Sequence, residues 1–163
     1  MQFTKVDFDD SIDDFSSALL QDLVINQVKP DIINFFKNQY YVLVNLQYEK
    51  LLIDFTISYH DIYQVPIAYF RVYDQLTASS LWTFESLASS CQKLGFDTKV
   101  PVNIESHHIL QQSWWMIHPC ETKLYMSQFD LDDLIQYMVM WWSIYGLSGV
   151  FRNIILRTDL SRR

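Results

Sequence analysis

Among the side chains of this sequence that could do covalent chemistry, Cys120 stands out because of its position. It follows a run of large apolar residues, 114–117, and Pro119 comes directly before it. Because proline donates no backbone hydrogen bond, it ends a strand, and the cysteine is expected to leave the sheet into a loop. An exposed thiol there could act as a nucleophile toward another protein. The local pattern leaves a second interpretation open, in which Cys120 is a small apolar core residue.

The other cysteine, Cys91, lies in a segment predicted to be helical and is expected to be inert. The two cysteines form neither a Cys-x-x-Cys pair nor a cysteine–histidine spacing typical of zinc, so no metal site is expected. The sequence leaves open a disulfide between them. The segment Met1–Asp10 is acidic and has no apolar core, so no secretory signal is predicted. We therefore expect free thiols in a reducing, cytoplasmic compartment.

Composition favours a folded protein that does not bind nucleic acid. Of the 163 residues, 50% are apolar and 16% are aromatic, which is enough to build a core. With 3 glycines and 4 prolines the chain has few flexible joints, so residues 1–163 are expected to form a single domain. The formal net charge of −7 disfavours nucleic-acid binding, because phosphate contacts need clustered lysine and arginine.

Acidic side chains crowd the N-terminal region. They are Asp7, Asp9, Asp10, Asp13 and Asp14. Such a cluster is typical of a solvated helix start, where negative charge favours the helix dipole. It could instead form a docking surface for a basic partner.

One apolar segment, Leu134–Phe151, is about 18 residues long, which is near the lower limit for a membrane-spanning helix. Gln136 interrupts it near one end, Gly146 and Gly149 interrupt it near the other, and charged residues flank both ends. We therefore expect a buried helix and no transmembrane segment.

Periodicity predicts the remaining elements. Helices are expected over Ser11–Val24 with Ser11 as N-cap, over Thr77–Gln92, and as a long helix capped by Asp130. Strands are expected over Tyr40–Gln47, Leu51–Tyr59, Val65–Tyr73 and Ile109–Ile117, and Ile32–Phe36 is expected to form a short turn. Short connections favour an antiparallel meander. The predicted fold is α+β, a four-stranded antiparallel meander with an N-terminal helix, an inserted helix and a C-terminal helix.

Two segments resemble the autophagy-related protein 10 family. The run His118–Thr122 is similar to its His-Pro-Cys-x-Thr active-site segment, and Tyr63–Arg71 is similar to its Tyr-Gln-Val-Pro-x-x-Tyr-Phe-Arg strand. Further matches in the same order are Leu76-Thr77 with Trp82, His107, and Trp142-Ser143-Ile144 with Gly146. The resemblance covers roughly residues 51–150, and on it the chain is identified as a member of this family.

The resemblance implies a fold like that of ubiquitin-conjugating enzymes and a thioester mechanism. Cys120 would accept the ubiquitin-like modifier autophagy-related protein 12 from its activating enzyme, autophagy-related protein 7. It would then transfer the modifier to a lysine of autophagy-related protein 5 during autophagosome formation, without a separate ligase. No cofactor is expected, because the thioester supplies the energy. The protein is expected to be a monomer.

Four further residues are expected to support Cys120. His118 is expected to shape the turn through its ring or to act as a base, and Thr122 to donate to the oxyanion or to cap a turn or helix. Tyr63 either directs its hydroxyl to the reaction centre or buries its ring, and His107 is expected to be a loop histidine. Ordinary ubiquitin-conjugating enzymes have a His-Pro-Asn segment before the cysteine. That asparagine is absent here, so the sequence does not identify the oxyanion donor.

Two other classes of function compete with this one. A non-catalytic binding module of the same fold would act as a scaffold, although such proteins usually lose the cysteine. A cysteine protease would need one of the known local signatures, and none is present. For partner binding, Leu51–Tyr59 and Val65–Tyr73 are candidates for strand addition at an exposed sheet edge, and the acidic N-terminal helix is a candidate surface for the activating enzyme.

Overall fold

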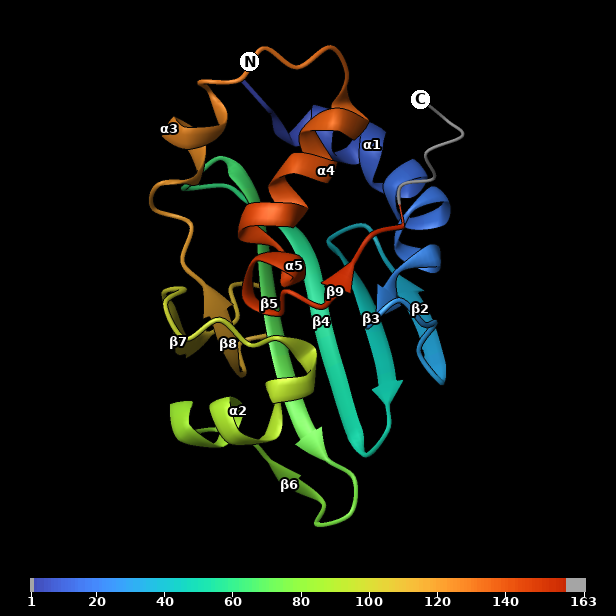
Figure 1. The fold of residues 1–163 in the computed structure, drawn as a ribbon. Coiled ribbons are helices and arrows are strands. Elements are labelled where there is room, and N and C mark those ends of the chain that lie inside the picture. The colour runs from blue at the N-terminus through green and yellow to red at the C-terminus, as the bar shows by residue number, and fades with distance from the viewer. Residues whose placement is uncertain (1, 158–163) are drawn as a thin grey trace.

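The computed structural model describes residues 2–157, in which helices cover one face of a large antiparallel sheet (Figure 1). The sheet has seven strands in the order β2-β3-β4-β5-β8-β7, and β6 pairs with β5. The strands are β2 (Ile32–Lys37), β3 (Tyr41–Tyr48), β4 (Leu51–His60), β5 (Val65–Asp74), β6 (Ser79–Ser80), β7 (Val102–Ser106) and β8 (Ser113–Ile117). A separate two-stranded sheet joins β1 (Val24–Ile25) to β9 (Ile154–Ile155).

Five α-helices and two short 3₁₀ helices complete the described chain. They are α1 (Lys5–Ala18), η1 (Leu20–Asp22), α2 (Phe84–Ser90), η2 (Gln92–Leu94), α3 (Thr122–Met126), α4 (Leu134–Tyr145) and α5 (Leu147–Val150). The α+β fold class is confirmed, and the four predicted strands correspond to β3, β4, β5 and β8, which are neighbours in the predicted order. The sheet is nevertheless larger than the expected four-stranded meander.

Apart from the two-residue strands, two strands were not expected. Residues 32–36 form strand β2 rather than a turn, because the segment pairs with β3 along its whole length. The hairpin closes at Asn38, whose side chain accepts hydrogen bonds from the backbone N–H groups of Tyr40 at 2.8 Å and Tyr41 at 3.0 Å. Strand β7 pairs with β8, but most of its side chains are exposed. Its first four residues do alternate apolar and polar side chains, but the run is short and mostly exposed, so a strand was not expected there.

The interior position of β4 and β5 overturns the expectation that they offer an edge for strand addition. Strand β4 lies between β3 and β5, and β5 lies between β4 and β8. Their backbone groups are therefore largely engaged inside the sheet. The outermost strands of the sheet order are β2 and β7.

Helix α1 begins earlier than predicted. Its N-cap is Thr4, which forms a reciprocal capping box with Asp7, so Ser11 is not the cap. Ser11 instead lies buried within the helix and donates its hydroxyl to the Asp7 carbonyl at 2.8 Å. Two of the N-terminal acids pair with lysines, Asp9 with Lys5 and Asp13 with Lys37. The acidic cluster thus includes a cap and local ion pairs.

The other two predicted helices are shorter than expected. Residues 77–83 do not join α2, because β6 pairs with β5 there and Thr83 caps the helix at its start. Helix α4 is capped by Asp133, which accepts a hydrogen bond from the Gln136 N–H at 2.7 Å, and not by Asp130. In α2, the pairing of β6 and the Thr83 cap delay the start that the apolar spacing predicts. In α4, the Asp133 cap does so.

The apolar segment 134–151 is divided between α4 and α5. Gly146 separates the two helices in an extended conformation. Within α5, a Cβ atom at Gly149 would lie 2.1 Å from the Ile144 carbonyl oxygen, so only glycine fits this close approach. No helix within residues 2–157 is long and apolar enough to cross a membrane.

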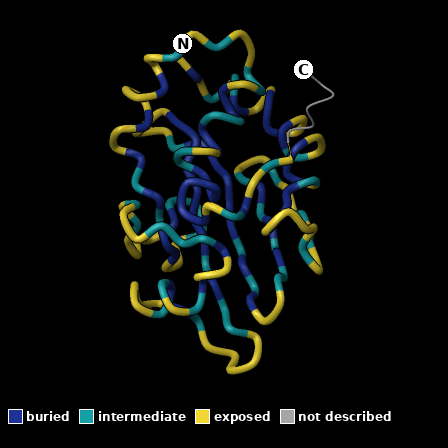
Figure 2. The backbone as a smooth tube through the Cα atoms, in the orientation of Figure 1, coloured by how far each residue is buried: buried dark blue, intermediate teal, exposed yellow. Residues whose placement is uncertain are grey.

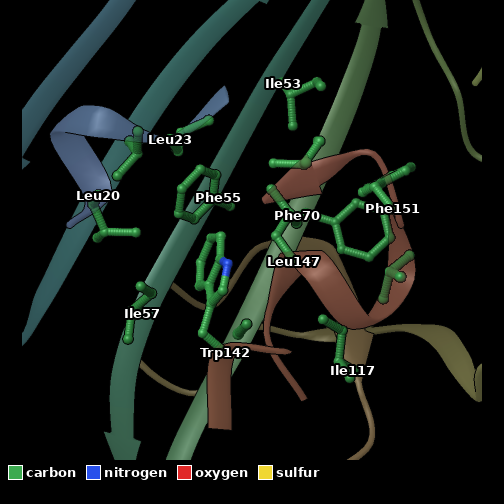
Figure 3. Close-up of a cluster of buried hydrophobic side chains, with 14 of the residues drawn as sticks. Leu20, Leu23, Ile53, Phe55, Ile57, Phe70, Ile117, Trp142, Leu147 and Phe151 are labelled. Carbon is green, nitrogen blue, oxygen red and sulfur yellow. The ribbon is translucent and has the colours of Figure 1, made fainter. Parts of the chain in front are cut away.

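The main core lies between the sheet and helices α1, α4 and α5, where buried residues of the central strands and the helices meet (Figure 2). Trp142 of α4 faces Phe55 of β4 with ring centroids 5.4 Å apart, and Leu20 and Leu147 complete their surroundings (Figure 3). All four side chains are fully buried. This packing fixes α4, and with it the chain that enters α4, against the centre of the sheet.

We expect Phe55→Ala to lower the free energy of unfolding by about 3–5 kcal/mol, because it removes a fully buried ring and leaves a cavity under Trp142. Urea unfolding followed by tryptophan fluorescence measures the change. Leu124→Ala, at an exposed position of α3, is the control and should change stability by less than about 0.5 kcal/mol. Equal effects of the two changes would contradict this description of the core.

Candidate functional site

Cys120 is an exposed free thiol in the turn that joins β8 to α3. The prediction that it leaves the sheet after Pro119 is therefore confirmed, and its interpretation as a core residue is excluded. Cys91 is also a free thiol but is buried, so the two cysteines form no disulfide. Burial raises the pKa of the Cys91 thiol to about 12, so this thiol stays protonated at neutral pH.

Local hydrogen bonds shape the turn around Cys120. The ring nitrogen Nδ1 of His118 accepts the backbone N–H of Cys120 at 3.2 Å, and the Pro119 carbonyl accepts the N–H of Thr122 at 3.1 Å. Because Nδ1 is an acceptor here, the neutral ring carries its proton on Nε2 and can donate from that atom. The Cys120 N–H is already used and does not serve as an oxyanion donor in this arrangement.

Tyr63 lies beside the same turn although it is far away in the sequence. It belongs to the connection between β4 and β5, which passes next to α3 (Figure 1). Its ring meets the ring of His118 edge-on, with centroids 6.3 Å apart, and it remains 38% exposed. The neighbouring Gln64 accepts a hydrogen bond from the Lys123 ammonium of α3. The fold thus brings two turns together at Cys120, and the Tyr63 ring is not buried.

Thr122 does not act as predicted. It is the first residue of α3, and the cap position before it is occupied by Glu121, so Thr122 is not a helix cap. Its side chain is fully buried, and its hydroxyl has no hydrogen-bond partner among the described residues. The hydroxyl is therefore enclosed and is not offered to the turn around Cys120.

His107 makes its contacts on the outer face of the sheet, away from the helices. Its Nδ1 accepts the N–H groups of Ile109 and Leu110 at 3.1 Å, and its Nε2 lies 2.8 Å from the Thr56 hydroxyl. The ring stacks on Tyr69 with centroids 4.1 Å apart. His107 is fully buried and anchors the loop 107–112, as expected of a loop histidine.

Two histidines next to the site were not anticipated. His108 lies 2.8 Å from the Ser58 hydroxyl through Nε2, and its ring is 4.7 Å from the ring of His60. His60 in turn contacts Tyr63, with centroids 4.9 Å apart. The one sequence signal was the adjacent pair of histidines at 107 and 108. Their contact with residue 60 arises because the loop that carries them packs on β4 through side-chain contacts.

A groove of about 470 Å³ adjoins the turn on the side of α4. It is lined by His118 and Glu121 beside the cysteine, and by Lys99, Tyr145 and Arg152. Burial, together with the nearby side chains of Glu121, Tyr125 and Cys120, raises the pKa of Tyr145. Within residues 2–157 no group of three or more His, Cys, Asp or Glu side chains could hold a metal ion.

Comparison with known proteins identifies the family. Residues 7–152 match the family described as autophagocytosis associated protein, active-site domain. The chain belongs to this family. The ubiquitin-like-conjugating enzyme ATG10 of Candida albicans is 29% identical over 96% of this chain and 93% of its own length. The predicted family and the prediction of a conjugating enzyme are thereby confirmed.

Two solved structures share the fold. The solution structure of KmAtg10 has a TM-score of 0.62 and 20% identity, covering 93% of this chain and 96% of that one. The crystal structure of the autophagic E2 Atg10 has a TM-score of 0.53 and 14% identity, covering 93% and 98%. At these identities the two structures support the fold, and they agree with the predicted conjugating-enzyme architecture.

We expect one thiol per native chain to react with Ellman's reagent, because Cys120 is exposed whereas Cys91 is buried with a pKa near 12. The absorbance of the released product counts the reactive thiols. Cys120→Ser should abolish the reaction, Cys91→Ser should leave it unchanged, and both thiols should react in denaturant. A rapid reaction of Cys91 in the native protein would contradict the structure.

Acid should destabilise the protein through His107. Burial, helped by the nearby charges of His108 and Arg71, lowers its pKa from 6.5 to about 3. Between these two values the unfolded chain binds the proton more readily, so this contribution to stability is lost as the pH falls below about 6.5. The loss reaches about 2 kcal/mol at pH 5.

Urea unfolding at pH 7.5 and pH 5 tests this effect. His107→Asn keeps a side-chain acceptor for the N–H groups of Ile109 and Leu110 but cannot be protonated. Its stability should fall by about 2 kcal/mol less than that of the wild type between the two pH values. The same fall in both proteins would show that His107 does not resist protonation.

Proposed function

We propose that Cys120 is the nucleophile that carries the ubiquitin-like modifier autophagy-related protein 12. The modifier comes from autophagy-related protein 7 and goes to a lysine of autophagy-related protein 5. The observation that supports this role is the exposed thiol of Cys120 in a His-Pro-Cys-x-Thr segment, within a chain that belongs to the active-site-domain family. The protein is proposed to act in the cytoplasm as a monomer and as one domain over residues 1–163.

Loading is an exchange of one thioester for another. The Cys120 thiolate attacks the carbonyl carbon of the modifier's thioester on the activating enzyme. A new C–S bond forms, the old C–S bond breaks, and the activating enzyme's sulfur leaves as a thiolate. The two thioesters are similar in energy, so the rate depends mainly on how well the exposed thiol can reach the bound carbonyl.

Discharge transfers the modifier to an amine. The neutral lysine amine bonds to the thioester carbonyl carbon, the C–S bond breaks and Cys120 leaves as a thiolate. One of the two amine protons passes to solvent, and the other stays on the amide nitrogen. The carbonyl oxygen becomes negative on the way and needs a hydrogen-bond donor. We assign this role to Nε2 of His118, because its Nδ1 is held by the Cys120 N–H and Nε2 is the free donor. Thr122 is not assigned a role, since its hydroxyl is enclosed.

Two features support a catalytic protein over a scaffold of the same fold. The thiol is exposed rather than packed, and two turns from distant parts of the sequence, at Tyr63 and His118, meet beside it. A binding module would need neither arrangement. The groove is lined by His118 and Glu121, the neighbours of the turn that carries the thiol.

Incubation with the modifier, the activating enzyme and ATP, followed by a non-reducing gel, tests the role of Cys120. The wild type and Cys91→Ser should form an adduct that dithiothreitol removes, because both retain the exposed thiol. Cys120→Ser should form a dithiothreitol-resistant oxyester or no adduct. A wild-type protein without a thiol-sensitive adduct, or an adduct lost in Cys91→Ser but kept in Cys120→Ser, would exclude the proposed function.

A further inference from the structure

His60 links the candidate site to the outer face of the sheet through a row of rings. It is the last residue of β4 and is partly buried. Its ring contacts Tyr63, with centroids 4.9 Å apart, and His108, with centroids 4.7 Å apart. Tyr63 in turn meets His118, whose Nδ1 holds the backbone of Cys120. The row therefore runs from His108 to the turn that carries the thiol.

His60 also closes the connection between β4 and β5. Its Nδ1 accepts the backbone N–H of Tyr63 at 3.3 Å, and its carbonyl oxygen accepts the N–H of Gln64 at 2.7 Å. Gln64 adopts a left-handed conformation with φ of 59°, which turns the chain back into β5. Two hydrogen bonds and one ring contact from His60 thus fix the position of Tyr63.

The ring of His60 packs against the ring of His108, which other contacts hold in place. Nε2 of His108 lies 2.8 Å from the hydroxyl of Ser58, which projects from the same face of β4 as His60. The backbone N–H of His108 donates to the Tyr69 hydroxyl at 3.4 Å. Burial lowers the pKa of His60, so at neutral pH its ring is neutral and Nδ1 remains an acceptor. At neutral pH, His60 therefore has both its contact with His108 and a free acceptor at Nδ1 for the Tyr63 N–H.

We propose that His60 is a positioning residue of the conjugating reaction, which holds Tyr63 against His118 and so orders the groups around the Cys120 thioester. This inference rests on the proposed function of Cys120. Both steps pass through an oxyanion. The effect should fall mainly on discharge, because exchange between two similar thioesters depends mainly on access to the thiol. His60 acts through Tyr63, because its ring contacts Tyr63 and His108 and not the thiol of Cys120.

A single-turnover discharge assay tests this role. The protein is first loaded with the modifier, the activating enzyme is inactivated, and the loss of thioester is followed after the acceptor protein is added. His60→Ala should load to the wild-type extent but discharge about tenfold more slowly, which is less than the roughly hundredfold loss that a misplacement of about 1 Å can cause. His60→Asn keeps an acceptor for the Tyr63 N–H and should recover most of the rate.

A double-mutant cycle with Tyr63→Ala separates positioning from general damage. If His60 acts through Tyr63, then His60→Ala should slow discharge no further once Tyr63 is already alanine. Amide hydrogen exchange on the unloaded protein should show faster exchange at Tyr63 in His60→Ala than in His60→Asn. The urea midpoint of each variant shows whether the fold is retained.

The possible failures are distinguishable. A wild-type protein that carries no thiol-sensitive adduct overturns the proposed function, and this role with it. A wild type that loads and discharges, together with an unchanged discharge rate in His60→Ala, overturns only the role of His60. Independent, multiplicative effects of His60→Ala and Tyr63→Ala would do the same, because they would show that His60 does not act through Tyr63.

Discussion

The packing of α4 onto the centre of the sheet is the contact on which the rest of the structure depends. Trp142 buries its ring against Phe55, and the neighbouring Trp141 donates its indole N–H to the Pro66 carbonyl at 3.0 Å. Pro66 lies at the start of β5, directly after the connection that carries Tyr63. A helix that buries its aromatic side chains there therefore also fixes one side of the candidate site. The turn with Cys120 must then fit between β8 and the entry to α4.

Histidines give the site its local shape by accepting backbone hydrogen bonds. His60, His107 and His118 each accept an N–H group two or three residues ahead through Nδ1. This use of the ring resembles a turn made by an asparagine side chain, and it fixes the neutral tautomer with the proton on Nε2. At His118 the result is a free donor beside an exposed thiol. At His107 the same geometry serves stability, because the ring is enclosed.

The two faces of the sheet differ in chemistry and in role. The inner face carries the main core, in which Phe55 and Phe70 pack against helices, and most of its groups are apolar. The outer face carries buried polar side chains, Thr56 and Ser58, which are satisfied by histidines of one loop. Buried polar groups need such partners. The polar face also supports the row of rings that ends at the cysteine turn, so it contributes to the site as well as to the fold.

The sequence alone determined the features that depend on local chemistry. Proline before Cys120 placed the thiol outside the strand, apolar alternation located the central strands, and the run 118–122 indicated the family. Tertiary structure decided the rest. It showed that β2 and β7 are strands, that Thr122 is enclosed, and that Tyr63 meets His118. The physical reason is that periodicity reports the burial of a segment's own side chains, whereas pairing and contact depend on residues that are far apart along the chain.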